Sequence, residues 1–226
     1  MLAAQWRQEA SARSLGDPEP MPVCWKLTEP AVMDHPRFIM SGELSFTGRS
    51  DQIGSFAAQF RQLRRRRLVI LGNPGSGKTT LAVQLLLELL ATRQPGEPIP
   101  VLVSLAGWDP ITQPRLHDWL AARMTQDYSS LRAFSPTMAH ALAKRGHLLP
   151  ILDGLDELPE PRQAGVVAAL NESLTDTDQL VLTSPHHRVH HSGYRRPAQA
   201  KRRCGHHPRA THRSPSCGIP HALPTT

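Results

Sequence analysis

Hydrophobic residues along the chain follow two alternating patterns. Short apolar runs bounded by Gly, Pro or charged residues predict strands that are buried on both faces. These runs lie at residues 68–71, 101–105, 148–153 and 180–183. Longer segments predict helices, and they lie at residues 51–63, 80–92, 116–124, 137–144 and 162–174. Strands that alternate with helices predict an α/β fold, a three-layer sandwich in which helices cover both faces of a parallel sheet.

The pattern is interrupted at both ends of the chain. Prolines recur in residues 1–45, where apolar periodicity is poor, so this segment is predicted to be irregular. After Ser184 apolar periodicity stops, and His, Arg, Pro, Ser and Gly dominate. We therefore expect three parts: the irregular segment, a folded domain at 46–184, and a tail at 185–226 that is predicted to be disordered.

Charge is distributed unevenly between these parts. The whole chain has a formal net charge of +7. Residues 185–226 contain eight Lys or Arg and no Asp or Glu, whereas residues 1–184 contain 18 Lys or Arg against 19 Asp or Glu. The net charge is therefore a property of the basic tail, and the domain is close to neutral.

Composition also bears on the compartment. Three cysteines are too few for a disulfide framework, which favours a reducing, cytoplasmic setting. The chain has no apolar run of about 18 residues, so no membrane partner is expected. Its first residues lack the charged start and apolar stretch of a signal peptide.

Four consecutive arginines, Arg64–Arg67, follow the first predicted helix of the domain. One interpretation is a solvated helix end, because cations are favourable near the carboxyl end of the helix dipole. The other interpretation is a surface patch that binds a polyanion.

A glycine-rich motif, G-x-x-x-x-G-K-T, lies between the first predicted strand and the next helix. Its glycines let backbone N–H groups curl around phosphate oxygens, and the helix directs its positive end at the same anion. Lys78 is expected to reach the β- and γ-phosphates, and Thr79 to bind Mg²⁺. The predicted ligand is ATP or GTP with Mg²⁺. The predicted nucleotide-binding residues are Gly72, Asn73, Pro74, Gly75, Ser76, Gly77, Lys78, Thr79 and Thr80.

A second motif, which is acidic, follows the third predicted strand. Asp153 is placed at the carboxyl end of that strand, where ligands bind in open α/β sheets, and is predicted to hold Mg²⁺ together with Thr79. Asp156 and Glu157 follow within one turn. Either could orient or deprotonate an attacking water, so both are candidate catalytic residues. The alternative is an acidic pair that stabilises a helix start.

Together the two motifs resemble the NACHT group of STAND NTPases. The resemblance rests on residues 72–80 and on Leu-Asp-Gly-Leu-Asp-Glu-Leu at 152–158, and it covers about residues 44–184. Phe46-Thr47-Gly48-Arg49 is similar to an element that contacts adenine in such proteins. Val103-Ser104-Leu105, with Trp108 and Asp109, is similar to the strand after the P-loop helix.

The resemblance implies a signalling switch that binds ATP or ADP, hydrolyses slowly and self-oligomerises when intact. Such proteins carry a sensor arginine just after the fourth strand, followed by a helical lid and a winged helix. Here Pro185 stands at the arginine position and Arg188 follows three residues later, and neither a fifth strand nor a winged helix is recognisable. We therefore expect nucleotide binding with slow or no hydrolysis; the alternative is a P-loop ATPase that acts on nucleic acid through the tail.

The tail has several interpretations. It could bind nucleic acid, be an ordinary disordered tail, or result from a reading-frame shift after Ser184, which is the interpretation we favour because the change falls within a motif. Zinc binding is a further interpretation, although the spacing fits no known finger. A sheet truncated at this point would expose apolar edges, so we expect poor solubility or marginal stability. The zinc candidates are Cys204, His206, His207, His212 and Cys217.

Overall fold

A parallel sheet organises the chain. The structure is a computed structural model that describes residues 6–8, 11, 24–26, 48–49, 52–128 and 137–185. Within these residues, four strands pair in parallel in the order β3-β6-β5-β4. The predicted α/β fold with a parallel sheet is confirmed. The strands are β3 (Arg67–Leu71), β4 (Ile99–Ser104), β5 (Leu148–Asp153) and β6 (Leu180–Ser184).

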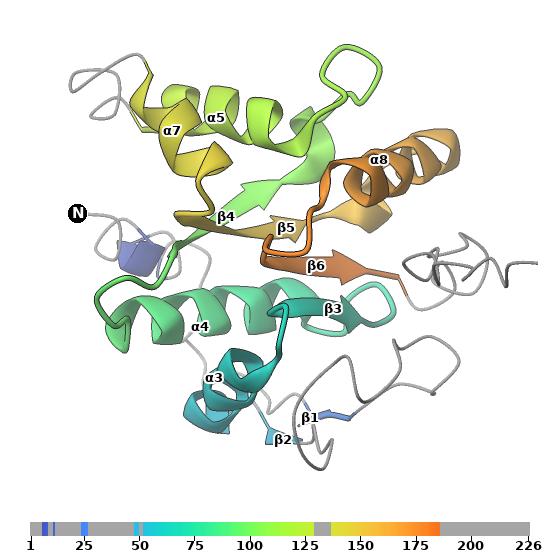
Figure 1. Ribbon diagram of the computed structural model, residues 1–226. Coiled ribbons are helices and arrows are strands. Elements are labelled where there is room, and N and C mark those ends of the chain that lie inside the picture. Colours follow the sequence, from blue (N-terminus) through green and yellow to red (C-terminus); the bar gives the residue numbers. More distant parts are fainter. Residues whose placement is uncertain are drawn as a thin grey trace, which may run out of the picture. The chain divides into compact units, whose positions relative to one another are not determined.

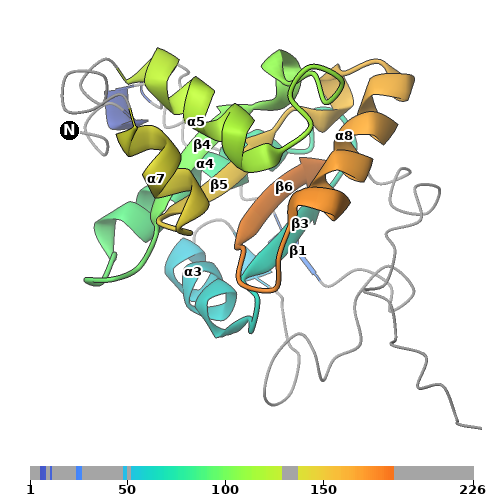
Figure 2. The same ribbon diagram turned by 45° about the horizontal axis from the view of Figure 1, so that its top comes forward.

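Helices cover both faces of this sheet (Figure 1). On one face lie α3 (Ile53–Gln62) and α4 (Lys78–Ala91). On the other face lie α5 (Leu116–Asp127), α7 (Met138–Lys144) and α8 (Glu160–Ser173), which are in front of the strands in Figure 2. Two 3-10 turns, η3 (Leu105–Gly107) and η4 (Leu155–Glu157), follow β4 and β5 directly.

Neighbouring residues of each strand face opposite cores. In β4, Val101 and Val103 pack with α5, α7 and α8, whereas Leu102 packs with α3 and α4. In β6, Leu182 packs with α5, α7 and α8, whereas Val181 packs with α3 and α4; the two side chains are 2% and 0% exposed. Side chains of a strand alternate between faces, so a sheet covered on both sides needs an apolar residue at almost every position. This requirement explains the continuous apolar runs of the sequence.

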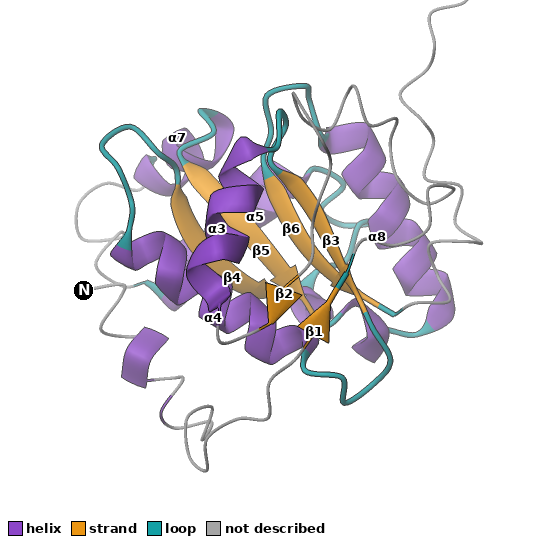
Figure 3. Cartoon of the chain, turned by 90° about the horizontal axis from the view of Figure 1, so that it is seen from below, coloured by secondary structure: helices purple, strands orange, loops and turns teal. Residues whose placement is uncertain are grey.

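A second, two-stranded sheet involves the segment that was predicted to be irregular. Residues Cys24–Trp25 form β1, which pairs antiparallel with β2 at Gly48–Arg49. The Trp25 ring lies 4.6 Å from the ring of Phe56 on α3, measured between centroids. Figure 3 views the molecule from the side of this small sheet, α3 and α4. The first 45 residues therefore contain a strand, and their pairing crosses the domain boundary predicted at residue 46.

The run Arg64–Arg67 begins just after the helix, and the helix-end interpretation holds for Arg66, whose Nε donates to the Arg61 carbonyl in the last turn of α3 at 3.4 Å. The polyanion interpretation stays a prediction. Helix α3 ends at Gln62, and Leu63 after it is extended, with φ −63° and ψ 129°. Arg66 has a φ of +46°, and Arg67 is already the first residue of β3. Apolar spacing continues to Leu63, but the backbone has to turn there to enter the sheet. The arginines therefore form the connection between a helix and a strand.

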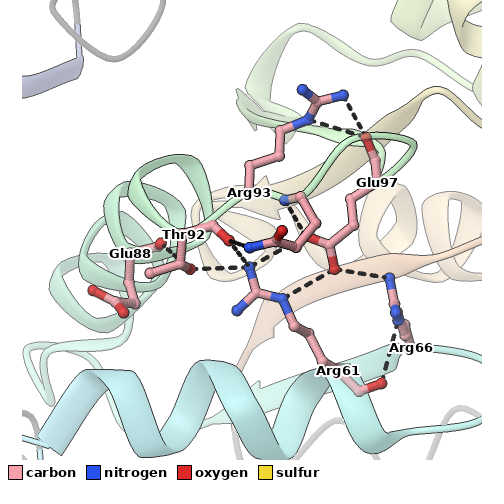
Figure 4. Close-up of polar contacts among 7 residues, drawn as sticks. Arg61, Arg66, Glu88, Thr92, Arg93 and Glu97 are labelled. Carbon is pink, nitrogen blue, oxygen red and sulfur yellow. Dashed lines mark hydrogen bonds and ion pairs between the residues drawn. The ribbon is translucent and has the colours of Figure 1, made fainter.

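Glu97, in the connection between α4 and β4, gathers several of the basic side chains (Figure 4). Arg61 Nε donates to Glu97 Oε1 at 3.0 Å, and Arg66 Nη1 lies 3.7 Å from the same oxygen. The backbone N–H of Gln94 donates to Oε2 at 3.0 Å. Burial raises the pKa of Glu97, but the Gln94 and Arg61 hydrogen bonds outweigh it, and the pKa is lowered from 4.5.

Asp178 is a second acidic centre, just before β6. It accepts hydrogen bonds from the backbone N–H and the hydroxyl of Thr175, both at 2.7 Å, and lies 3.0 Å from His117 Nε2. Arg67 Nε donates to its backbone carbonyl at 3.0 Å. Burial raises the pKa of Asp178, but the Thr175 and His117 contacts outweigh it, and the pKa is lowered from 3.8.

No helix within the described part of the chain is long and apolar enough to cross a membrane. The predicted tail lies outside the described residues beyond Pro185, and its frame-shift, zinc and nucleic-acid interpretations stay predictions. The expectation of marginal stability also stays a prediction.

Candidate functional site

The glycine-rich loop leaves the carboxyl end of β3 and enters α4, as its position between a strand and a helix predicts. Its first N–H, from Gly72, donates to the carbonyl of Ser184 at the end of β6, at 3.2 Å. Residues 73–76 are exposed. Gly75 and Gly77 have φ values of +75° and +83°, in the left-handed region that favours glycine. The loop is therefore anchored to the sheet at its base and open to solvent at its tip.

Gly72 is required for a different reason, which is close packing. A Cβ atom at this position would lie 2.3 Å from Ser76 Oγ and 3.3 Å from Lys78 Cγ. The Ser76 N–H also donates to the Asn73 carbonyl at 3.1 Å, which closes the loop on itself. Helix α4 begins at Lys78 with no side-chain cap on its first N–H groups. Uncapped N–H groups at a helix start are suited to binding an anion.

Lys78 lies beneath this loop, and its side chain is only 7% exposed. Its Nζ donates to the carbonyls of Gly72 and Asn73, both at 3.1 Å. It also forms an ion pair with Asp156 Oδ2 at 3.1 Å. The two predicted motifs, some 70 residues apart in the sequence, are therefore joined through this lysine.

Asp153 and Thr79, the two predicted metal ligands, are in direct contact. Thr79 Oγ1 donates to Asp153 Oδ1 at 3.2 Å. Within the described ranges, no hydrogen bond is made to the other carboxylate oxygen of Asp153. A hydroxyl and a carboxylate are the oxygen ligands that Mg²⁺ prefers, directly or through water. The donor set fits Mg²⁺, with Thr79 and Asp153 as the residues that would hold it.

Thr183 is a site residue that the sequence prediction missed. It lies on β6 next to Asp153, is 0% exposed, and its hydroxyl donates to Asp153 Oδ1 at 2.6 Å. The same hydroxyl accepts from the N–H of Gly154 at 3.2 Å. The signal for it was a polar residue at the carboxyl end of an otherwise apolar strand. Thr183 therefore fixes both the Asp153 carboxylate and the turn that follows it.

The structure separates the two candidate catalytic residues, which the sequence could not. Asp156 faces the loop, with a 24% exposed side chain held by Lys78. Glu157 is exposed, and its N–H donates to the Gly154 carbonyl at 3.2 Å. Gly154 has a φ of +84°, and a Cβ there would lie 3.2 Å from Glu157 Oε2. The left-handed glycine therefore directs the two acidic side chains to different surroundings.

Other predicted residues lie farther from this centre. Thr80 is a half-buried residue of α4, and Pro74 is exposed at the loop tip. Gly48 and Arg49 belong to β2, which packs beside α3, while Phe46 and Thr47 lie outside the described residues. Arg188 is also outside them. The described residues contain no group of three or more His, Cys, Asp or Glu that could hold a metal ion.

The Trp108 segment supports the site from the neighbouring strand. Trp108 is 0% exposed and stacks on Trp119, with ring centroids 4.9 Å apart and planes at 16°. Arg162 Nη2 donates to its carbonyl at 3.0 Å. This packing ties the connection after β4 to α5 and α8, and the role of Trp108 here is structural.

A family comparison bears on the whole arrangement. The model of the NACHT domain matches residues 66–198, more than half of the chain. The chain belongs to the NACHT family. A NACHT domain is a nucleotide-binding P-loop NTPase domain, and the match includes both motifs that meet at Lys78. It runs past Ser184, where we predicted the sequence to depart from the family. Neither the curated proteins nor the solved structures contain a match to this chain.

Proposed function

We propose that this NACHT domain binds ATP or GTP with Mg²⁺ at the carboxyl end of its sheet and acts as a nucleotide-controlled switch with slow or no hydrolysis. The observation that carries the proposal is the meeting of Lys78, Thr79 and Asp153 beneath an exposed glycine loop.

Each residue has a proposed task. The backbone N–H groups of Asn73 and of residues 75–78 bind phosphate oxygens, and the Lys78 ammonium binds the terminal phosphates. Thr79 and Asp153 hold Mg²⁺, which neutralises phosphate charge when bound. Thr183 orients the Asp153 carboxylate through its 2.6 Å hydrogen bond. Asp156 and Glu157 are the candidates for orienting water.

Slow or absent hydrolysis is supported by the surroundings of the two acids. Asp156 is paired with Lys78 at 3.1 Å, so in this arrangement its carboxylate is turned to the lysine and not to an attacking water. Glu157 is exposed, and its carboxylate lies against Gly154. Neither acid is therefore placed as an efficient general base in this arrangement. Self-oligomerisation is proposed for this chain only as a consequence of the switch function.

The test is the affinity of fluorescent ATP and GTP analogues, with Mg²⁺, for the wild type, Lys78→Ala and Asp153→Ala. Lys144→Ala is the matched control, because Lys144 is 58% exposed on α7. We expect Lys78→Ala to weaken binding at least about 30-fold, since truncating a buried charge partner is expensive. Lys144→Ala should bind as the wild type does. Equal binding by the wild type and Lys78→Ala would contradict the proposal.

The rate of nucleotide hydrolysis is tested by measuring phosphate release with and without DNA or RNA. Wild-type turnover is expected to be negligible under both conditions. Turnover stimulated by nucleic acid would instead favour an ATPase that acts on nucleic acid.

A further inference from the structure

The Lys78 ammonium has no hydrogen left for a ligand. An ammonium group has three N–H donors. Three acceptors lie at 3.1 Å from Nζ: the carbonyls of Gly72 and Asn73 and the Asp156 carboxylate. A phosphate oxygen can therefore bind Lys78 only if one of these acceptors gives up its donor.

Of the three acceptors, Asp156 is the one that can leave. Gly72 is held at the end of β6 through its N–H, which donates to the Ser184 carbonyl at 3.2 Å, and the Asn73 carbonyl also accepts from the Ser76 N–H at 3.1 Å, so both carbonyls are fixed by the backbone of the loop. The Asp156 side chain is partly exposed, whereas Leu155 beside it on η4 is 1% exposed and anchors the turn. The carboxylate can therefore rotate into solvent while η4 stays packed.

Charge points to the same acceptor. Asp156 carries the same sign as a phosphate, so the two anions repel each other when both approach Lys78. A carbonyl carries no net charge and can remain in place. Repulsion increases with the number of phosphate charges near the pair, so a triphosphate should displace Asp156 more effectively than a diphosphate does.

We propose that the Lys78–Asp156 ion pair is a latch on the Lys78 ammonium that is opened by the terminal phosphate of a nucleoside triphosphate. Asp156 is thus a positioning residue that competes with the nucleotide for Lys78 and distinguishes triphosphate from diphosphate. This inference rests on the proposed function, because it needs nucleotide to bind at Lys78.

The first test compares Asp156→Asn with Glu172→Gln, which removes an exposed carboxylate on α8, outside the proposed site. Affinities are measured for a non-hydrolysable ATP analogue and for ADP. The latch predicts that Asp156→Asn binds the triphosphate at least about fivefold more tightly than the wild type, in the range of usual coupling effects, and gains less for ADP. Glu172→Gln should change both affinities by less than about twofold. Asp156→Glu keeps the negative charge, so its preference between the ATP analogue and ADP should be the same as that of the wild type.

The second test needs no ligand and covers the case in which Asp156→Asn folds poorly. Melting temperatures are measured for Lys78→Met, Asp156→Asn and the double variant. Each single change leaves a partly buried charge without its partner, whereas the double change removes both. The melting temperature of the double variant is therefore expected to be several degrees higher than the value obtained by adding the losses of the two single variants. Additive effects would mean that the two side chains are not coupled, and the latch would be wrong.

Failure of the latch and failure of the proposed function would give different experimental results. Weaker triphosphate binding by Asp156→Asn, with normal wild-type binding, would mean that Asp156 helps to hold the nucleotide. That result overturns the latch and leaves the proposed function intact. A wild type that binds neither nucleotide would contradict both.

Discussion

The charged side chains at the two ends of the parallel sheet have different kinds of partners. At the amino-terminal ends of the strands, Glu97 and Asp178 are surrounded by arginines, a histidine and N–H donors, and each acid is compensated by side chains of other elements. At the carboxyl ends, Lys78 is held mainly by backbone carbonyls, and the loop above it is exposed.

This difference shows that the most conspicuous charge in a sequence need not mark the functional site. The run Arg64–Arg67 stands out in the sequence, yet Arg66 and Arg67 contact Glu97 and the Asp178 backbone at the end of the sheet away from the glycine loop. The proposed site has a single buried cation, Lys78, held by two backbone carbonyls and the Asp156 carboxylate. We therefore expect changes at the amino-terminal end to alter stability, and changes at the carboxyl end to alter binding.

The largest expected effect on stability is that of Asp178→Asn. The change removes a 13% exposed carboxylate that accepts from Thr175 and contacts His117. We expect the free energy of unfolding to fall by about 2 kcal/mol, measured by urea denaturation at pH 7. Asp176→Asn is the control in the same turn, and it should cost less than about 0.5 kcal/mol because Asp176 is 84% exposed. A change in nucleotide affinity in Asp178→Asn would contradict the separation of the two ends.

Gly154→Ala should have a smaller effect on stability, at the other end. A side chain is strained at a φ of +84°, and its Cβ would lie 3.2 Å from Glu157 Oε2. We expect a loss of about 1–2 kcal/mol, together with weaker nucleotide binding. Gly165→Ala in α8 is the control, because nothing lies within 4 Å of a Cβ there. That change should stabilise the helix by about 0.5–1 kcal/mol. Equal stability of the two variants would show that the turn conformation is not needed.

The smallest expected effect is that of Glu97→Gln, and it depends on pH. The lowered pKa of Glu97 means that its ionised form is favoured in the folded state. Its contribution is therefore present above pH 4.5 and is lost as the pH falls through the lower folded pKa. We expect the wild type to be more stable than the variant by about 1 kcal/mol at pH 7. This difference should disappear in strong acid. A difference that grows as the pH falls would contradict the assignment.

The fold and much of the site could be predicted because their signals are local. The run at 148–153 coincides with β5, and the glycine motif lies between β3 and α4 as its position required. The contact between Lys78 and Asp156 could not be predicted, since the strand order brings together residues that no local pattern relates.

The missed features share this cause. Thr183 became a site residue because β6 pairs with β5 beside Asp153. The strand at Cys24–Trp25 depends on a partner more than 20 residues away, and two residues are too few for a periodic signal. The role of the arginine run could not be recognised from the sequence, because its contacts are with Glu97 and Asp178, which lie in distant connections.

Amide hydrogen exchange with and without ATP and Mg²⁺ tests the central claim most directly, because it examines both ends of the sheet in one experiment. We predict slower exchange at residues 72–80 and 153–157 when nucleotide is present, since bound phosphate accepts from the loop N–H groups. Residues 93–97 and 175–178 should exchange at unchanged rates. Unchanged exchange in the loop, or protection confined to the Glu97 and Asp178 end, would contradict the account.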